Sequence, residues 1–454
     1  MSTLGPDIPR LPRALETAGL SEEAVAVVTV RFESLLRQFT AERFDVRRCD
    51  AWFVPGRIEV LGKHTDYGGG RSLICAVERG LCIVSAPRGD NQLSVVDTRR
   101  NSSVVIDPGA PRPSIKWANY AATVLDRLHR NFPGLVRGAD VMFDSDLPSA
   151  SGMSSSSALM IAVLLSLVRA SGLESTALWQ KNIQSAADVA AYAATIENGS
   201  GFRELDAERG VGTRGGSEDH TAVLCSRPEQ IAQYSFRPTR HERSIELAPE
   251  WIFAVAVSGV RAQKTGNARE DYNRASERVT AIVERWRSAT GRDDETLAAA
   301  LASSPDAAER LRGLLSTPDS PLPDRFSHFL EESTVLVPAA GDQLERGDFE
   351  GFAKTVARSQ ELAERLLGNQ VPETMTLARL ARAHGAVAAS AFGAGFGGSV
   401  WALVERASAP AFLERWQNAY AHAHPDRASR AAFLVSRPGP GAINLGDVIS
   451  SAAL

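Results

Sequence analysis

A loop of small polar residues joins a predicted strand to a predicted helix in the first half of the chain. Residues 147–157 read Leu-Pro-Ser-Ala-Ser-Gly-Met-Ser-Ser-Ser-Ser, residues 139–143 alternate like a strand, and residues 158–168 are apolar enough for a buried helix. The loop would place free backbone N–H groups and the positive end of a helix dipole together, where an anion can bind. A flexible serine-rich linker is the alternative, but a linker does not lie between a strand and an apolar helix. The stretch therefore predicts a phosphate-binding loop.

A second polar loop follows the predicted short strand that begins at residue 51. It is rich in side chains that donate or accept hydrogen bonds, among them Arg57, Lys63, His64 and Asp66. Hydroxyl groups are recognised by such directed donors and acceptors, so this loop could hold a sugar. The alternative is a solvated turn at residues 66–70.

Two glycine-rich stretches lie further along the chain. Residues 210–220 end on the carboxylates Glu218 and Asp219, although an aspartate after two glycines is more often a turn or cap residue. Residues 393–398 contain Gly-x-Gly-x-x-Gly. A dinucleotide loop follows a strand and opens a helix, whereas here we predict a helix before the glycines, at 377–389, and a strand after them. We therefore exclude NAD, and a tight glycine turn is the alternative.

Three of these stretches resemble, in order, the motifs of the GHMP small-molecule kinases. Residues 56–67 resemble the galactokinase signature Gly-Arg-x-Asn-Leu-Ile-Gly-Glu-His-x-Asp-Tyr, residues 148–156 resemble the second motif, and residues 390–398 resemble the third. Two positions depart from the signature, because Glu59 replaces its asparagine and Lys63 replaces its glutamate.

The resemblance implies the α+β, two-domain GHMP kinase fold. Its N-terminal domain is similar to domain 2 of ribosomal protein S5 and its C-terminal domain is ferredoxin-like. From a polar, proline-containing stretch before a predicted buried strand at 251–257, we place the boundary near residue 235. The expected domains are thus 1–235, with the sugar signature and the phosphate loop, and 236–454, with the third motif.

The resemblance also assigns candidate roles to individual residues. Arg57 and Asp219 match catalytic positions. The substrate-binding candidates are Lys63, His64, Asp66, Gly216 and Tyr272. The nucleotide-binding candidates are Pro148, Ser151, Gly152, Met153, Ser154, Ser155, Ser156 and Ser157. For Mg²⁺, Ser156 would supply a hydroxyl, and either Glu208, at the more typical spacing, or Glu197 would supply the carboxylate.

The implied activity is ATP- and Mg²⁺-dependent phosphorylation of the anomeric C1 hydroxyl of a hexose, with galactose as the first candidate. Lys63 introduces a cation that would pair with an anion at C6, so a uronate such as galacturonate is an alternative. A second alternative is a galactokinase-like sugar sensor without catalysis. Trp117 and Tyr120 resemble a family Trp-x-x-Tyr, but we interpret them as core aromatics of an amphipathic helix at 117–130.

Composition limits the possible partners. The chain has 454 residues, a net charge of −4 and no polybasic run, which argues against nucleic acid and membrane surfaces and favours a small-molecule partner. Its four cysteines have no metal-ligand spacing, and we see no signal peptide. We expect a cytoplasmic monomer or homodimer. Further elements expected are a helical pattern at 14–36 and a β-hairpin at 81–106.

Overall fold

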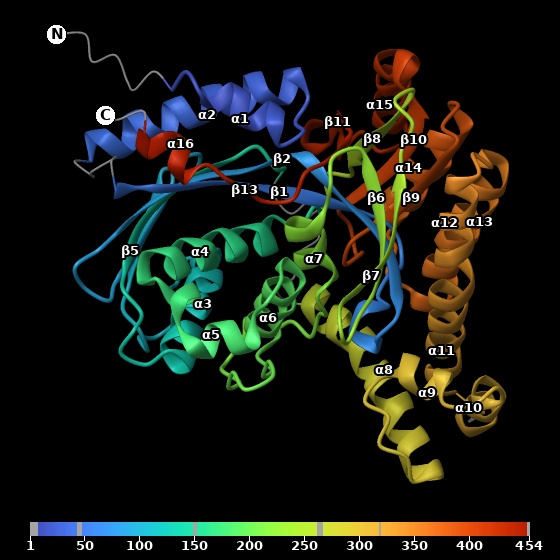
Figure 1. The fold of residues 1–454 in the computed structure, drawn as a ribbon. Coiled ribbons are helices and arrows are strands. Elements are labelled where there is room, and N and C mark those ends of the chain that lie inside the picture. The colour runs from blue at the N-terminus through green and yellow to red at the C-terminus, as the bar shows by residue number, and fades with distance from the viewer. Residues whose placement is uncertain (1–7, 43–47, 149–151, 261–266, 317–318, 452–454) are drawn as a thin grey trace.

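The computed structural model describes residues 8–42, 48–148, 152–260, 267–316 and 319–451 (Figure 1). Its strands are β1 (Asp50–Leu61), β2 (Arg71–Pro87), β3 (Leu93–Asp97), β4 (Ser102–Ile106), β5 (Ala139–Ser145), β6 (Gln230–Ser235), β7 (Arg240–Glu246), β8 (Trp251–Val257), β9 (Ala388–Phe392), β10 (Ser399–Glu405), β11 (Ala432–Ser436), β12 (Pro438–Gly439) and β13 (Ile443–Asn444).

The helices alternate with these strands in the first half of the chain and dominate the second. They are α1 (Leu11–Thr17), α2 (Glu22–Ala41), α3 (Ala118–Asn131), α4 (Ser155–Ser171), α5 (Ala177–Asn182), α6 (Ala186–Asn198), α7 (Glu218–Cys225), α8 (Asn267–Thr290), α9 (Leu297–Ala302), α10 (Ala307–Leu315), α11 (Leu322–Glu331), α12 (Val337–Glu345), α13 (Phe349–Leu362), α14 (Pro372–Ala383), α15 (Ala409–Ala423) and α16 (Gly446–Ser451). In the described part of the chain, no helix is long and apolar enough to cross a membrane.

A large mixed sheet organises the first half of the chain. Its main path runs β13-β1-β2-β5-β3-β4, and β6, β7 and β12 extend it beside β2. The predicted hairpin at 81–106 is wrong in its pairing, because β5 lies between β2 and β3 and pairs in parallel with β3. Alternating residues identify a strand, but they do not identify its partner.

Helices cover both faces of this sheet. Figure 1 shows α1, α2 and α16 on one face and α3, α4, α6 and α7 on the other. The predicted helical pattern at 14–36 forms two helices, since Gly19 takes a left-handed φ of 96° between them. Helix α4 is apolar nearly all round and is buried between β1, β2 and α3, so its N-terminus is rigidly placed beside the sheet.

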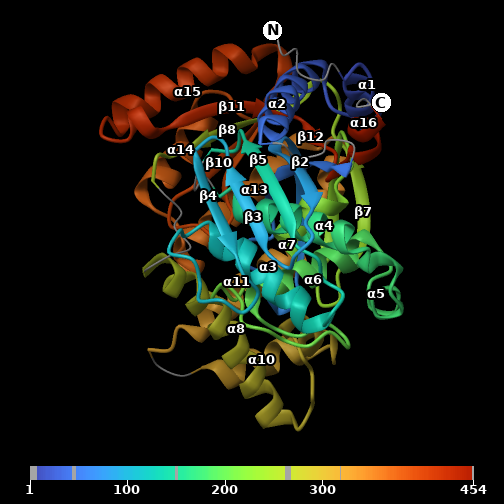
Figure 2. The same cartoon turned by 90° about the vertical axis from the view of Figure 1, so that its left-hand side faces the viewer.

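A smaller antiparallel sheet, in the order β11-β8-β10-β9, lies in the second half of the chain (Figure 2). Helices α14 and α15 cover one face, while Phe352 of α13 stacks on Trp401 from the other. The predicted helix at 377–389 ends earlier, at Ala383, and β9 follows it. The glycine-rich stretch therefore joins two antiparallel strands, β9 and β10, which still excludes a dinucleotide-binding order.

The predicted boundary at residue 235 falls inside the hairpin formed by β6 and β7. Both strands belong to the large sheet, and β12 and β13 return to it near the end of the chain. We therefore propose a division between Glu246 and Trp251, with residues 438–444 completing the first domain.

Candidate active site

The phosphate loop ends where α4 begins. Ser154 precedes the helix in a left-handed conformation, with a φ of 58°, and Gly152 has a φ of 75°. Pro148 is half-buried at the start of the loop, and Ser151 lies outside the described residues. Gly152, Ser154, Ser155 and Ser156 line a cavity of about 680 Å³, whereas Met153 and Ser157 are fully buried behind it. The helix N-terminus thus faces a cavity, as an anion site requires.

Aromatic and basic side chains, Arg57 among them, also line this cavity. The aromatic residues are Trp117, Tyr120 and Phe143, and the other basic residues are Arg99, Arg100, Arg112, Lys116, Arg209 and Arg269. Trp117 packs edge to face on Phe143 at 5.7 Å between ring centroids. Trp117 and Tyr120 pack against the hydrophobic core, as we interpreted them, but they are only partly buried and also line this cavity. The cavity combines apolar surface with positive charge, which suits a nucleotide.

Arg57 and Asp219 lie side by side. Arg57, on β1, donates from Nε to Asp219 Oδ1 at 2.8 Å, and its Nη2 is 2.6 Å from the same oxygen. Its Nη1 donates to the carbonyl of Gly152 in the phosphate loop. Burial opposes the charge of Arg57, but the carboxylates of Asp219, Glu218 and Glu59 outweigh it and raise the pKa. Arg57 therefore stays a cation that links the carboxylate to the phosphate loop.

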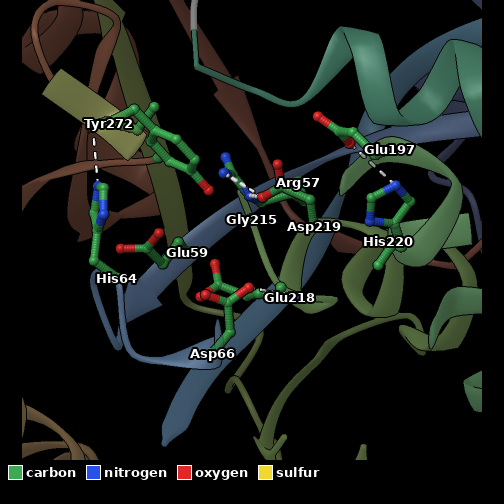
Figure 3. A pocket seen from close by; sticks show the side chains of 14 residues that line it. Arg57, Glu59, His64, Asp66, Glu197, Gly215, Glu218, Asp219, His220 and Tyr272 are labelled. Carbon is green, nitrogen blue, oxygen red and sulfur yellow. Dashed lines mark hydrogen bonds and ion pairs between the residues drawn. The ribbon is translucent and has the colours of Figure 1, made fainter. Parts of the chain in front are cut away.

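A narrow polar pocket adjoins the larger cavity and shares Arg57, Asp219 and Ala394 with it. Figure 3 shows the carboxylates of Glu59, Asp66 and Glu218 gathered on one side of this pocket, with Glu197 and His220 on the opposite side. The predicted residues His64, Asp66, Gly216 and Tyr272 all line it. The structure thus brings together residues that are more than 200 positions apart in the sequence.

Close contacts fix this pocket's walls. His64 Nδ1 lies 3.1 Å from the Tyr67 hydroxyl, and Nε2 lies 3.1 Å from the carbonyl oxygen of Ala394. Asp66 Oδ2 accepts a 3.2 Å bond from the backbone N–H of Glu218. A side chain at Gly216 would place its Cβ only 2.5 Å from Asp66 Oδ2, so glycine is required for this approach.

Lys63 is the predicted sugar-binding residue that the structure does not bring to the pocket. Its side chain is fully buried and its Nζ donates to Ser359 Oγ of α13 at 3.0 Å. Ser359 in turn donates to Glu332 at 2.8 Å, and Glu332 also accepts from the backbone N–H groups of Gly62 and Lys63. The charge-matching argument for a uronate therefore loses its basis, because this ammonium does not line the pocket.

The two candidate magnesium glutamates differ in position. Glu197 is buried at the end of α6, where it accepts from Ser157 Oγ at 3.3 Å and Thr213 Oγ1 at 3.2 Å, and it lines the polar pocket. Glu208 is half-buried and lines a separate surface hollow with residues 108–112. Glu197 thus lies in the polar pocket and Glu208 outside it, because residues 199–210 form a loop between the two.

The glycine-rich loop between β9 and β10 closes the site. A Cβ at Gly393, which has a φ of 80°, would lie 2.8 Å from the carbonyl oxygen of Gly152. The next residue, Ala394, contacts His64 through its carbonyl group. The three motifs therefore meet at one place.

Gly152 itself is packed against this second loop. A Cβ added there would lie 3.3 Å from the carbonyl oxygen of Phe392, and a β-branched residue is strained at its positive φ. We expect Gly152→Val to weaken ATP binding by about tenfold, because backbone N–H groups of this loop would supply the phosphate contacts. Calorimetric titration with ATP measures this effect, and an unchanged affinity in a folded variant would contradict it.

Several residues of the pocket were not among the predicted site residues, and two of them, Glu59 and Glu218, carry carboxyl groups. Glu59 was noticed only as a departure from the signature, and Glu218 only as a neighbour of Asp219. Their common position in the pocket depends on β1 and the start of α7 lying together. Both residues depart from the galactokinase motifs, and these departures were the one indication in the sequence that they belong to the site.

Three family models match the chain. They are the galactokinase galactose-binding signature at residues 39–87, the N-terminal domain of the GHMP kinases at 119–203 and their C-terminal domain at 342–422. The chain therefore carries the N-terminal and C-terminal domain signatures of the GHMP kinase superfamily, in the family's order. It also carries a galactokinase-type signature, and the predicted α+β GHMP kinase fold is confirmed.

Galactokinases are among its relatives. One from Roseiflexus sp. (strain RS-1) is 26% identical over 84% of this chain and 88% of its own length. Another, from Glaesserella parasuis, is 34% identical, but the chain spans only 29% of that relative's length. The crystal structure of Lactococcus lactis galactokinase complexed with galactose aligns with a TM-score of 0.75 at 20% identity, over 90% of this chain and 99% of that one. At this identity the structural likeness establishes the fold.

Proposed function

We propose that this chain is an ATP-dependent sugar kinase that phosphorylates the anomeric C1 hydroxyl of a galactose-type hexose. The single observation that carries the proposal is the junction of two cavities. The nucleotide-sized cavity and the narrow polar pocket share Arg57 and Asp219, so a phosphate donor and a hydroxyl acceptor would meet there. The galactokinase-type signature and the galactokinase relatives support galactose as the first candidate.

The chemistry would depend on positioning and electrostatics. Asp219 would orient the acceptor hydroxyl and take its proton, while Arg57 would offset the charge that develops on the transferred group. The N-terminus of α4 would hold the donor phosphates through backbone N–H groups. Because Arg57 bonds both Asp219 and Gly152, one side chain would fix the acceptor base relative to the phosphate loop.

The residues present fit a magnesium nucleotide. The indole Nε1 of Trp117 and the hydroxyl of Ser154 line the larger cavity, are buried, and have no hydrogen-bond partner among the described residues. Glu197 and Ser156 supply oxygen ligands of the kind Mg²⁺ prefers. When bound, Mg²⁺ would neutralise phosphate charge during transfer. We propose Glu197 and Ser156 as its protein ligands.

The direct test is to incubate the purified chain with ATP, Mg²⁺ and a panel of hexoses, uronates and sugar phosphates. We expect ADP and a sugar 1-phosphate from a galactose-type hexose. Galactose binding without any ADP release would instead indicate a non-catalytic sugar sensor.

Glu197→Gln and Glu208→Gln form a matched pair that tests the metal assignment. We expect Glu197→Gln to raise the Mg²⁺ concentration for half-maximal activity by about tenfold or more, because a neutral amide is a weaker ligand than a carboxylate. Glu208→Gln should leave it unchanged, since Glu208 faces a different surface hollow. The reverse result in a magnesium titration would assign the metal to Glu208.

A further inference from the structure

The buried carboxyl groups of Glu59 and Glu218 make one side of the polar pocket acidic. Glu59, on β1, is 3% exposed, and Glu218, at the start of α7, is 4% exposed. Both line the pocket, and the Oε1 atom of each is buried with no hydrogen-bond partner in the described parts of the chain. A buried carboxylate oxygen without a partner is costly, so these two atoms indicate a ligand that donates to them.

The side chain of Glu218 also interacts with that of Glu59 and partly offsets the rise in the pKa of Glu59. Burial raises the pKa of Glu59 to about 7 even though Arg57 and Lys63 oppose the shift. Burial, followed by the nearby carboxylates Glu59 and Asp66, holds the pKa of Glu218 well above its usual range. The other oxygen of Glu218 accepts a 2.8 Å bond from Ser72, which anchors that carboxyl group to β2.

Little positive charge balances the carboxyl groups that line this pocket. The residues that line the pocket include five carboxyl groups, namely Glu59, Asp66, Glu197, Glu218 and Asp219. Arg57 is the one arginine or lysine described in the lining, and its guanidinium is bonded to Asp219 and Gly152. The ammonium of Lys63 is bonded to Ser359. An anionic sugar would therefore be repelled from this pocket.

A protonated amine matches this surface better than a hydroxyl does. An ammonium offers three donors and a positive charge, and charge-assisted hydrogen bonds are about twice as strong as neutral ones. It would supply donors to both Oε1 atoms and would favour the ionised forms of Glu59 and Glu218.

We propose that Glu59 and Glu218 determine substrate specificity by binding a protonated amino group, so that this kinase prefers an amino-substituted galactose-type hexose and excludes uronates. The proposal rests on the proposed sugar kinase function. It refines the substrate of the same pocket and leaves the roles of Arg57 and Asp219 unchanged.

Steady-state kinetics with ATP and three sugars test the proposal at neutral pH. The sugars are galactose, galactosamine and galacturonate, which are neutral, cationic and anionic. We expect kcat/KM for galactosamine to exceed that for galactose by about tenfold or more in the wild type, with no turnover of galacturonate. A preference for galactose, or turnover of galacturonate at a comparable rate, would overturn the proposal without any variant.

Isosteric variants then assign the preference to the two carboxyl groups. In Glu59→Gln and Glu218→Gln, we expect the galactosamine-to-galactose ratio to fall by about tenfold, because the amide keeps the shape and loses the charge. Glu373→Gln is the control, since the Glu373 side chain is only 12% exposed, pairs with Arg427 and does not line the pocket. An unchanged ratio in both folded pocket variants would contradict the assignment.

The same measurements separate this proposal from the proposed function. If galactosamine binds in calorimetry but no sugar is phosphorylated, the kinase function fails and the selectivity for an amine stands. If galactose is phosphorylated but galactosamine has no advantage, the selectivity fails and the kinase function stands.

Discussion

Asp219→Asn is expected to lower kcat for sugar phosphorylation by a factor of about 10² to 10⁴, the usual effect of losing a positioned base. The asparagine preserves the shape of the side chain but cannot accept a proton from the sugar hydroxyl. Because Asp219 lies at the start of α7 and not in the phosphate loop, ATP affinity should stay nearly unchanged. Single-turnover assays and ATP calorimetry measure the two quantities separately.

Asp206→Asn is a suitable control, because the Asp206 side chain is 68% exposed and its ion pair with Arg130 is at the surface. We expect wild-type kcat for this variant. Full activity in Asp219→Asn would show that another group takes the proton.

Lys63→Glu is expected to destabilise the folded chain by about 3–5 kcal/mol, the cost of breaking a buried charge network. The new carboxylate would lie beside Ser359 and Glu332, and Lys63 and Glu332 are both fully buried. Two like charges would then share a site without water. Urea unfolding followed by circular dichroism measures the change in the free energy of unfolding.

A double variant provides the control for this effect. Lys63→Met combined with Glu332→Gln removes both charges, and glutamine can still accept from the backbone N–H groups of Gly62 and Lys63. Since neutral replacements of a buried ion pair are often tolerated, we expect most of the stability to return. A Lys63→Glu variant as stable as the wild type would show that the hydrogen-bond network of Lys63, Ser359 and Glu332 does not stabilise the fold.

The sequence by itself identified the features that depend on local order. Small residues before an apolar helix predicted the phosphate loop, because close backbone approach and a free helix N-terminus are local properties. The three motifs, read in order, led to the family and its fold. Arg57, His64, Asp66, Gly216, Asp219 and Tyr272 were all predicted, and all line the pocket.

Properties that depend on partners distant in the chain were decided only by the tertiary structure. The strand at 93–97 pairs with β5 instead of its predicted hairpin partner, because strand alternation carries no information on pairing. The sequence left the choice between Glu197 and Glu208 open, with the more typical spacing at Glu208, and only the tertiary structure places Glu197 in the pocket.

The direction in which a side chain points could not be predicted from the sequence either. Lys63 follows the signature's spacing, yet its ammonium lies against α13, almost 300 residues later in the chain. Glu59 and Glu218 are 159 positions apart and meet only because β1 and α7 pack together. Burial and charge are set by such contacts, so the pocket's preference for a charged or neutral substrate arises from the tertiary structure and not from any single motif.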